Sequence, residues 1–251
     1  MAKRIPLSLC LSLGVIFVGV STQTAMTASP THPQTQPIAQ QGIAEIIAQN
    51  AAELTASEQA TLTLEDLPSG FAELPPELAA EVASRLDTLR EQLGQNSLKP
   101  DNFFAFVNQQ NFQLVFGFTG KIPDQAGQAS FDASLQQFKQ PEAQEQMVSQ
   151  LRERLKNFGE IKITEYGAIP ELNALANAST GLTLGLEMQK QPLRLDFAAF
   201  RRNSVGVFTA VMYAKGEQPA IGVEGVAQKL DDRIVKSSTD ANGSSLERVG
   251  Q

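Results

Sequence analysis

The sequence predicts an α+β fold: a mainly antiparallel sheet that helices cover on both faces, in an α/β/α sandwich. Strand-like segments in the second half of the chain follow one another across connections that are short enough for hairpin turns. Three further segments carry apolar residues at helical spacing on one side only, so each needs a sheet face to pack against. Together these observations place the helices outside an antiparallel sheet.

The N-terminal residues 1–28 have the pattern of a secretory signal peptide. Lys3 and Arg4 precede an apolar run over residues 7–20, and small and polar residues follow it. The run is shorter than the about 20 residues of a membrane-spanning helix, and no later apolar stretch is as long. We therefore expect an exported protein with no transmembrane span after leader removal. A retained leader that acts as an anchor is the alternative.

Residues 29–59 are predicted to be a flexible linker, because residues 29–41 are rich in Pro, Gln and Thr and offer little to bury. An alanine-rich stretch over residues 43–54 has room for one short helix. A single α+β domain is then predicted over residues 60–236. The polar residues 237–251 are predicted to form a disordered tail.

The first half of the domain is predicted to contain a strand near Glu65, then a helix and a hairpin. The helix begins at Pro75 and ends at Gly94. Its apolar stripe consists of Leu78, Val82, Leu86, Leu89 and Leu93. Residues 103–107 and 112–119 form the two strands of the hairpin, and in the second strand successive side chains alternate between two faces.

The second half is predicted to contain a helix, four strands and a final helix. Residues 121–140 are ambiguous, because Pro123 and Gly127 suggest a loop before three apolar positions. A helix then begins at Pro141 and ends at Gly159. The predicted strands cover residues 161–166, 182–188, 193–201 and 205–213, and the final helix covers residues 223–234.

The last predicted strand has apolar side chains on both of its faces. One face carries Val205, Val207, Val211 and Tyr213, and the other carries Phe208, Ala210 and Met212. A strand of this composition is typical of a sheet that is covered on both sides. We therefore expect it inside the sheet.

The chain has one cysteine and one histidine, and neither lies in the predicted domain. Cys10 belongs to the leader, so the exported chain is expected to have no disulfide, thiolate metal site or cysteine nucleophile. His32 lies in the linker, which excludes a histidine-assisted nucleophile and the usual zinc or haem ligands from the domain. We therefore expect no enzymatic activity, no catalytic residue, no metal site and no cofactor.

The charge of the chain argues against nucleic acid as a partner. The formal net charge is −7, and loss of Lys3 and Arg4 with the leader makes it more negative. Phosphate binding depends on clustered cations, and Arg201–Arg202 is an isolated pair with acidic residues nearby.

Two acidic pairs keep a carboxylate-only hydrolase open as an alternative function, along with calcium binding through oxygen ligands. Glu65 and Asp66 point to opposite faces if their segment is extended. Asp231 and Asp232 lie next to the apolar stripe of the final helix and most simply form a solvated surface. Both pairs are therefore interpreted as structural.

The phenylalanines of the hairpin suggest a second alternative, a carrier of a small apolar ligand in a Phe-lined pocket. These residues are Phe103, Phe104, Phe106, Phe112, Phe116 and Phe118. Burial in a core beneath the two longer helices is the simpler interpretation, since phenylalanine is ordinarily buried.

The long segment over residues 167–181 is the best candidate for a ligand-binding loop, because it lies between strands and is rich in small residues. Its polar residues and one arginine of a later strand are the candidate ligand-binding residues. They are Asn173, Asn177, Ser179, Thr180 and Arg201. A polar groove lined by Arg194, Asp196, Arg201 and Arg202 is an alternative to paired charges at strand ends, which is the simpler interpretation.

Two stretches of the sequence resemble a known group of proteins. Leu64-Glu-Asp-Leu-Pro-Ser-Gly-Phe71 resembles the opening of the domain in secreted cyanobacterial proteins of unknown function. The run that contains Phe200-Arg-Arg-Asn, Val211-Met-Tyr and Val226-Ala-Gln-Lys-Leu-Asp-Asp-Arg-Ile234 is similar to their strand–hairpin–helix ending and, more distantly, to that of the Mog1/PsbP-like group. That group includes photosystem II extrinsic proteins and extracellular sensor domains. The resemblance implies an antiparallel sheet between helices and no catalytic residue.

The sequence thus predicts a non-enzymatic binding or accessory domain of the periplasm or thylakoid lumen. Its expected partner is another envelope or thylakoid-lumen protein, rather than nucleic acid.

Overall fold

The computed structural model describes residues 60–92, 100–155 and 161–247. The predicted leader, the linker with its short helix, Gly94 and Gly159 lie outside the described residues. The elements are η2 (Leu64–Asp66), β1 (Phe71–Glu73), α2 (Pro76–Gln92), β2 (Asn102–Asn108), β3 (Gln113–Lys121), α3 (Gln125–Phe138), α4 (Pro141–Leu155), β4 (Ile161–Ala168), η4 (Pro170–Ala174), β5 (Ala178–Met188), β6 (Gln191–Arg202), β7 (Val205–Ala214) and α5 (Val223–Glu247).

Seven strands of the described residues form one sheet in the order β1-β2-β3-β7-β6-β5-β4, and every neighbouring pair is antiparallel. This sheet and its covering helices confirm the predicted α+β fold. Two groups of consecutive strands, β1–β3 and β4–β7, meet where β3 pairs with β7. We call this pairing the β3–β7 seam; it places Gln113 opposite Tyr213 and Lys121 opposite Val205.

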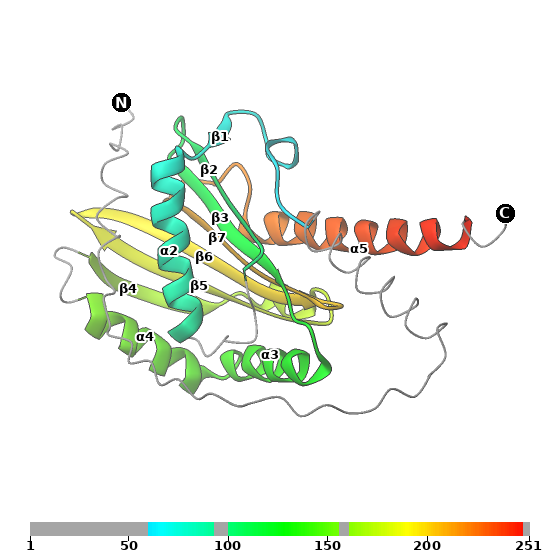
Figure 1. Ribbon diagram of the computed structural model, residues 1–251. Coiled ribbons are helices and arrows are strands. Elements are labelled where there is room, and N and C mark those ends of the chain that lie inside the picture. The colour runs from blue at the N-terminus through cyan, green and yellow to red at the C-terminus, as the bar shows by residue number, and fades with distance from the viewer. Residues whose placement is uncertain (1–59, 93–99, 156–160, 248–251) are drawn as a thin grey trace, which may run out of the picture.

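Helices cover both faces of the sheet, with α2 across one side and α5 extending past the end of the sheet (Figure 1). On one face, which we call the α5 face, Val207 and Val211 of β7 are buried in one core with Leu230 and Ile234 of α5. On the opposite face, the α2 face, Leu135 of α3 belongs to a second core with residues of α2 and α4. Residues of β7 contribute to both cores, as their sequence pattern predicts.

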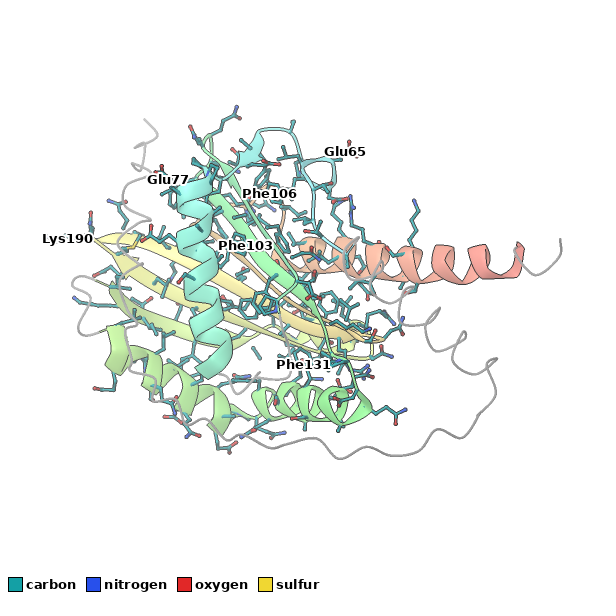
Figure 2. The ribbon with its side chains drawn as sticks, viewed as in Figure 1. Glu65, Glu77, Phe103, Phe106, Phe131 and Lys190 are labelled. Carbon is teal, nitrogen blue, oxygen red and sulfur yellow. The ribbon has the colours of Figure 1, made fainter. Side chains whose placement is uncertain are left out.

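The phenylalanines of β2 and β3 divide between the two cores. Phe104 and Phe106 lie in the core of the α5 face, whereas Phe116 and Phe118 lie in the core of the α2 face. Figure 2 labels Phe103, which packs against the core of the α2 face, and Phe106 on the same strand β2. The alternation of a strand thus sends these rings to opposite sides of the sheet rather than into one aromatic pocket.

Glu65 and Asp66 lie in the 3-10 helix η2, so the prediction of a strand at this point is wrong. The backbone N–H and the hydroxyl of Thr63 donate to Asp66 Oδ2 at 2.8 and 3.0 Å. Arg233 of α5 pairs with the same oxygen at 2.8 Å. Asp66 therefore closes a local turn and also ties it to α5.

Residues 125–138 form α3, which the ambiguous sequence pattern did not reveal. Asp124 has an extended backbone before the helix, and its Oδ1 accepts a hydrogen bond from the Gly127 N–H at 2.6 Å. Such a side-chain cap satisfies an N–H group that would otherwise have no partner within the helix. The cap and the burial of Phe131 and Leu135 outweigh the low helix propensity of Gly127.

The helix α5 continues to Glu247, whereas the sequence predicted a disordered tail from residue 237. The Ser237 hydroxyl donates to the Arg233 carbonyl and the Ser238 hydroxyl to the Ile234 carbonyl, both at 2.8 Å. These serines hydrogen-bond within the helix instead of competing with it.

The segment over residues 167–181 is shorter as a connection than the sequence suggested. It contains the 3-10 helix η4, and β5 already begins at Ala178. Among the described residues, no helix has the length and apolar character needed to cross a membrane.

Candidate functional site

Two of the predicted ligand-binding residues meet at one end of the sheet. The Asn177 N–H donates to the Arg201 carbonyl at 2.9 Å, and Asn177 Oδ1 accepts from the Asn203 N–H at 2.7 Å. The Arg201 guanidinium makes a bidentate pair with Asp132 of α3, at 2.7 Å from Nε and 2.6 Å from Nη2. Asn177 and Arg201 therefore order a turn and attach a helix.

The other three predicted residues do not join them in one site. Ser179 and Thr180 are neighbours on β5, so their side chains point to opposite faces of the sheet. The Ser179 hydroxyl is buried, and it has no hydrogen-bond partner among the described residues. Asn173 is exposed on η4, and its carbonyl accepts from Lys139 Nζ at 3.4 Å.

The next residue, Arg202, makes the equivalent contact on the other face. It pairs with Asp231 of α5, at 2.7 Å from Nε and 2.5 Å from Nη2. Only 7% of the Asp231 side chain is exposed, so the prediction of a solvated surface is wrong for Asp231, although Asp232 is exposed. The interpretation of the arginines as paired charges is confirmed, and the bonded carboxylates raise the pKa of both Arg201 and Arg202. We call the two ion pairs the arginine clamp.

A second polar group lies on the α5 face, away from the arginine clamp. Strand register places one residue each of five neighbouring strands in a row: Gln113, Tyr213, Arg194, Gly185 and Glu165. The next row contains Asp196 opposite Thr183. The alternation of the strands thus brings polar side chains from β4 to β7 onto one surface.

Asp196 is the centre of this group. Its Oδ1 accepts hydrogen bonds from Thr183 Oγ1 at 2.5 Å and Arg194 Nε at 2.9 Å, and its Oδ2 accepts one from the Tyr213 hydroxyl at 2.8 Å. The Asp196 side chain is only 8% exposed, so these donors replace the water that burial removes. We call Thr183, Arg194, Asp196 and Tyr213 the Asp196 cluster.

The electrostatics of the Asp196 cluster follow from this geometry. Burial and the hydrogen bond to Asp196 raise the pKa of the Tyr213 phenol well above its ordinary value of 10.0. The bond to Asp196 likewise raises the pKa of Arg194. Tyr213 therefore stays a neutral donor, and Arg194 stays a cation at physiological pH.

An ion pair lies over the outer part of this surface. Lys215 follows β7, and its Nζ contacts Glu165 Oε2 on β4 at 2.9 Å. The pair joins strands that lie three positions apart in the sheet. Gly185 lies beneath Glu165: a Cβ at Gly185 would overlap Glu165 Cγ and lie 2.8 Å from Thr164 Oγ1. A register shift between Ile163 and Glu165 brings both Thr164 and Glu165 over this glycine.

This surface suits the binding of an anionic group. The Arg194 side chain is 42% exposed, and its terminal nitrogens contact no other group within the described ranges. Its Nε donates to Asp196, and this hydrogen bond orients the terminal nitrogens for a carboxylate or phosphate. Over the same residues, no three His, Cys, Asp or Glu side chains converge as a metal site requires.

Comparison with known proteins gives structural similarity only. No family model and no curated protein matches the sequence. The structure is similar to that of the Saccharomyces cerevisiae Ran-binding protein Mog1p, with 15% sequence identity and a TM-score of 0.29, over 68% of this chain and 86% of that chain. A mutant of the protein Mog1 gives a TM-score of 0.28 with the same identity and coverage.

The local sequence pattern predicts only part of the Asp196 cluster. Arg194 and Asp196 are groove candidates from the sequence, whereas Thr183 and Tyr213 are not among the predicted site residues. The spacing of Arg194 and Asp196 by two residues in a strand was the available signal, because it places both on one face. The partners on β5 and β7 depend on strand register, which the local pattern does not contain.

Proposed function

We propose that the protein is an exported, non-enzymatic binding or accessory module that holds another envelope or thylakoid-lumen protein. The signal-peptide pattern over residues 1–28 supports export, and the resemblance of residues 64–71 to secreted cyanobacterial proteins supports the periplasm or thylakoid lumen. The partner binds on the α5 face around Arg194.

The observation that carries this proposal is a difference between the arginines in whether their terminal nitrogens are bonded within the chain. Arg201 and Arg202 are each used in a bidentate bond to a helix of the same chain. Arg194 donates only its Nε to Asp196, and its exposed terminal nitrogens stay available for a group outside the described residues. An arginine that the fold orients, but whose terminal N–H donors are left without a partner in the described residues, is suited to binding a group of another protein.

The test combines cell fractionation with site-specific photo-crosslinking of the full chain. A photoreactive residue at Glu165 should capture a protein in the extracytoplasmic fraction, and the same residue at the exposed Glu142 of α4 should not. Recovery of the chain only from the cytosol with its leader intact would contradict export. Equal capture from both positions would contradict binding on the α5 face.

A further inference from the structure

The group beside Arg194 indicates what the partner contributes. Glu165 is the nearest neighbour of Gly185 on the α5 face, and its carboxylate contacts Lys215 at 2.9 Å. The negative charge of Glu165 also acts on Arg194, which lies opposite Gly185. One carboxylate of this surface is therefore already paired with a cation, in the same row of the sheet as Arg194.

The ion pair that holds the Glu165 side chain is weak. The Glu165 side chain is 53% exposed and that of Lys215 is 42% exposed. Ion pairs of this kind contribute little to stability, because water solvates both partners and their side chains lose rotamer freedom. By contrast, the Asp196–Arg194 contact beneath it has a largely buried carboxylate. Glu165 can thus move away while Arg194 keeps its orientation.

Space for an incoming group comes from Gly185. A side chain at this position would overlap Glu165. Because the residue is glycine, only backbone atoms lie between Arg194 and Glu165 at the surface of the sheet. When Glu165 rotates towards solvent, a chain can approach the sheet at this point.

We infer that the partner is bound through an acidic peptide segment, one carboxylate of which displaces that of Glu165 from Lys215 and binds the terminal nitrogens of Arg194. This inference rests on the proposed function and adds the chemistry of recognition to it. Glu165 acts as an internal competitor, so the affinity for the segment is limited by the cost of displacing it.

The experiment measures binding of a labelled hexaglutamate peptide to the full chain by fluorescence anisotropy, with hexaglutamine as the neutral peptide. We expect Glu165→Gln to tighten hexaglutamate binding about threefold to tenfold, because the competing carboxylate is gone. Lys215→Gln and Arg194→Gln should each weaken it about tenfold. Lys215 is exposed, so its variant remains informative even if loss of Arg194 disturbs the fold around Asp196.

Glu187→Gln is the matched control. Glu187 is an acid of the neighbouring strand β5 whose side chain is 42% exposed and pairs with Lys162 at 3.9 Å, outside the Arg194 row. A general effect of negative charge would make Glu187→Gln and Glu165→Gln equally effective. That outcome, or no binding of hexaglutamate to Glu165→Gln, overturns the inference.

The outcomes separate this inference from the proposed function. If crosslinking at position 165 captures a partner whose bound segment has no Asp, Glu or C-terminal carboxylate, the binding module stands and acidic recognition fails. If crosslinking captures nothing, the proposed function fails, whatever the peptide does.

Discussion

At the scale of single residues, the buried carboxylate of Asp196 depends most on its hydrogen-bond donors. Three donors from three strands satisfy it: Thr183 from β5, Arg194 from its own strand β6, and Tyr213 from β7. Each donor alone is ordinary, but together they make the carboxylate a connection between neighbouring strands. Its removal should therefore affect stability as well as binding.

Asp196→Asn should lower the free energy of unfolding by about 2 kcal/mol, since the amide nitrogen turns one accepting position into a donor that faces other donors. Urea denaturation measures this change. Asp232→Asn on the exposed surface of α5 is the control and should change stability by less than about 0.5 kcal/mol. Equal effects of the two substitutions would show that Asp196 has no special role.

Tyr213 gives the fold a dependence on alkaline pH. Its pKa is raised in the folded state, so its contribution to stability is complete below about pH 10 and is lost as pH rises towards the folded pKa. The stability advantage of the wild type over Tyr213→Phe should therefore shrink by about 1 kcal/mol between pH 9 and pH 11. Urea unfolding of the wild type and Tyr213→Phe at both pH values measures this change. The stability difference between the wild type and Tyr166→Phe at the same pH values is the control. A constant advantage over Tyr213→Phe would contradict the raised pKa.

At the scale of elements, the arginine clamp attaches a helix to each face of β6. The two adjacent arginines point to opposite faces, Arg201 to Asp132 of α3 and Arg202 to Asp231 of α5. The two carboxylates differ in burial, with 29% of Asp132 exposed but only 7% of Asp231. The two halves of the clamp should therefore respond differently to the loss of their arginine.

Arg202→Gln should destabilise the protein by about 3 kcal/mol, because it leaves the buried carboxylate of Asp231 unpaired. Arg201→Gln should cost only about 1 kcal/mol, since water can reach Asp132. Denaturation curves of the two variants compare them directly. A larger loss for Arg201→Gln would mean that burial of the carboxylate does not control the cost.

Elements with a strong local pattern could be predicted from the sequence, and those that depend on a remote or capping contact could not. The alternation of β3 and β7 and the apolar stripe of α4 located these elements within a few residues. The helix α3 needed the extended conformation of Asp124 to form its cap. In the candidate site, Arg194 and Asp196 could be placed on one face, but Tyr213 joins them only through the pairing of β6 with β7.

At the scale of the whole molecule, one sheet separates two cores that do not share helices. Leu135 of α3 lies in the core of the α2 face, and Leu230 of α5 lies in the core of the α5 face; both are fully buried. The burial of both faces of β6 and β7 couples the layers into one structure. The apolar composition of β7 predicts this layering, but the strand order depends on long-range pairing that no local pattern contains.

Leu135→Ala and Leu230→Ala should each reduce the free energy of unfolding by about 3 kcal/mol through the loss of buried area and the cavity that remains. Because the sheet lies between the two sites, the double variant should show the sum within about 0.5 kcal/mol, in a single unfolding transition. Two separate transitions would show that the layers unfold independently.

The β3–β7 seam divides the sheet into two portions that are each continuous along the chain, β1–β3 before Pro123 and β4–β7 after it. Asp124 starts α3, which packs on β5 and β6, so a cleavage beside Pro123 would leave each helix with the strands it covers. The protein is thus suited to fragment complementation: two separately expressed pieces would reassemble along one long antiparallel junction. In folding, closure of that junction joins residues about 90 positions apart in the chain and would be the slow, entropy-limited step.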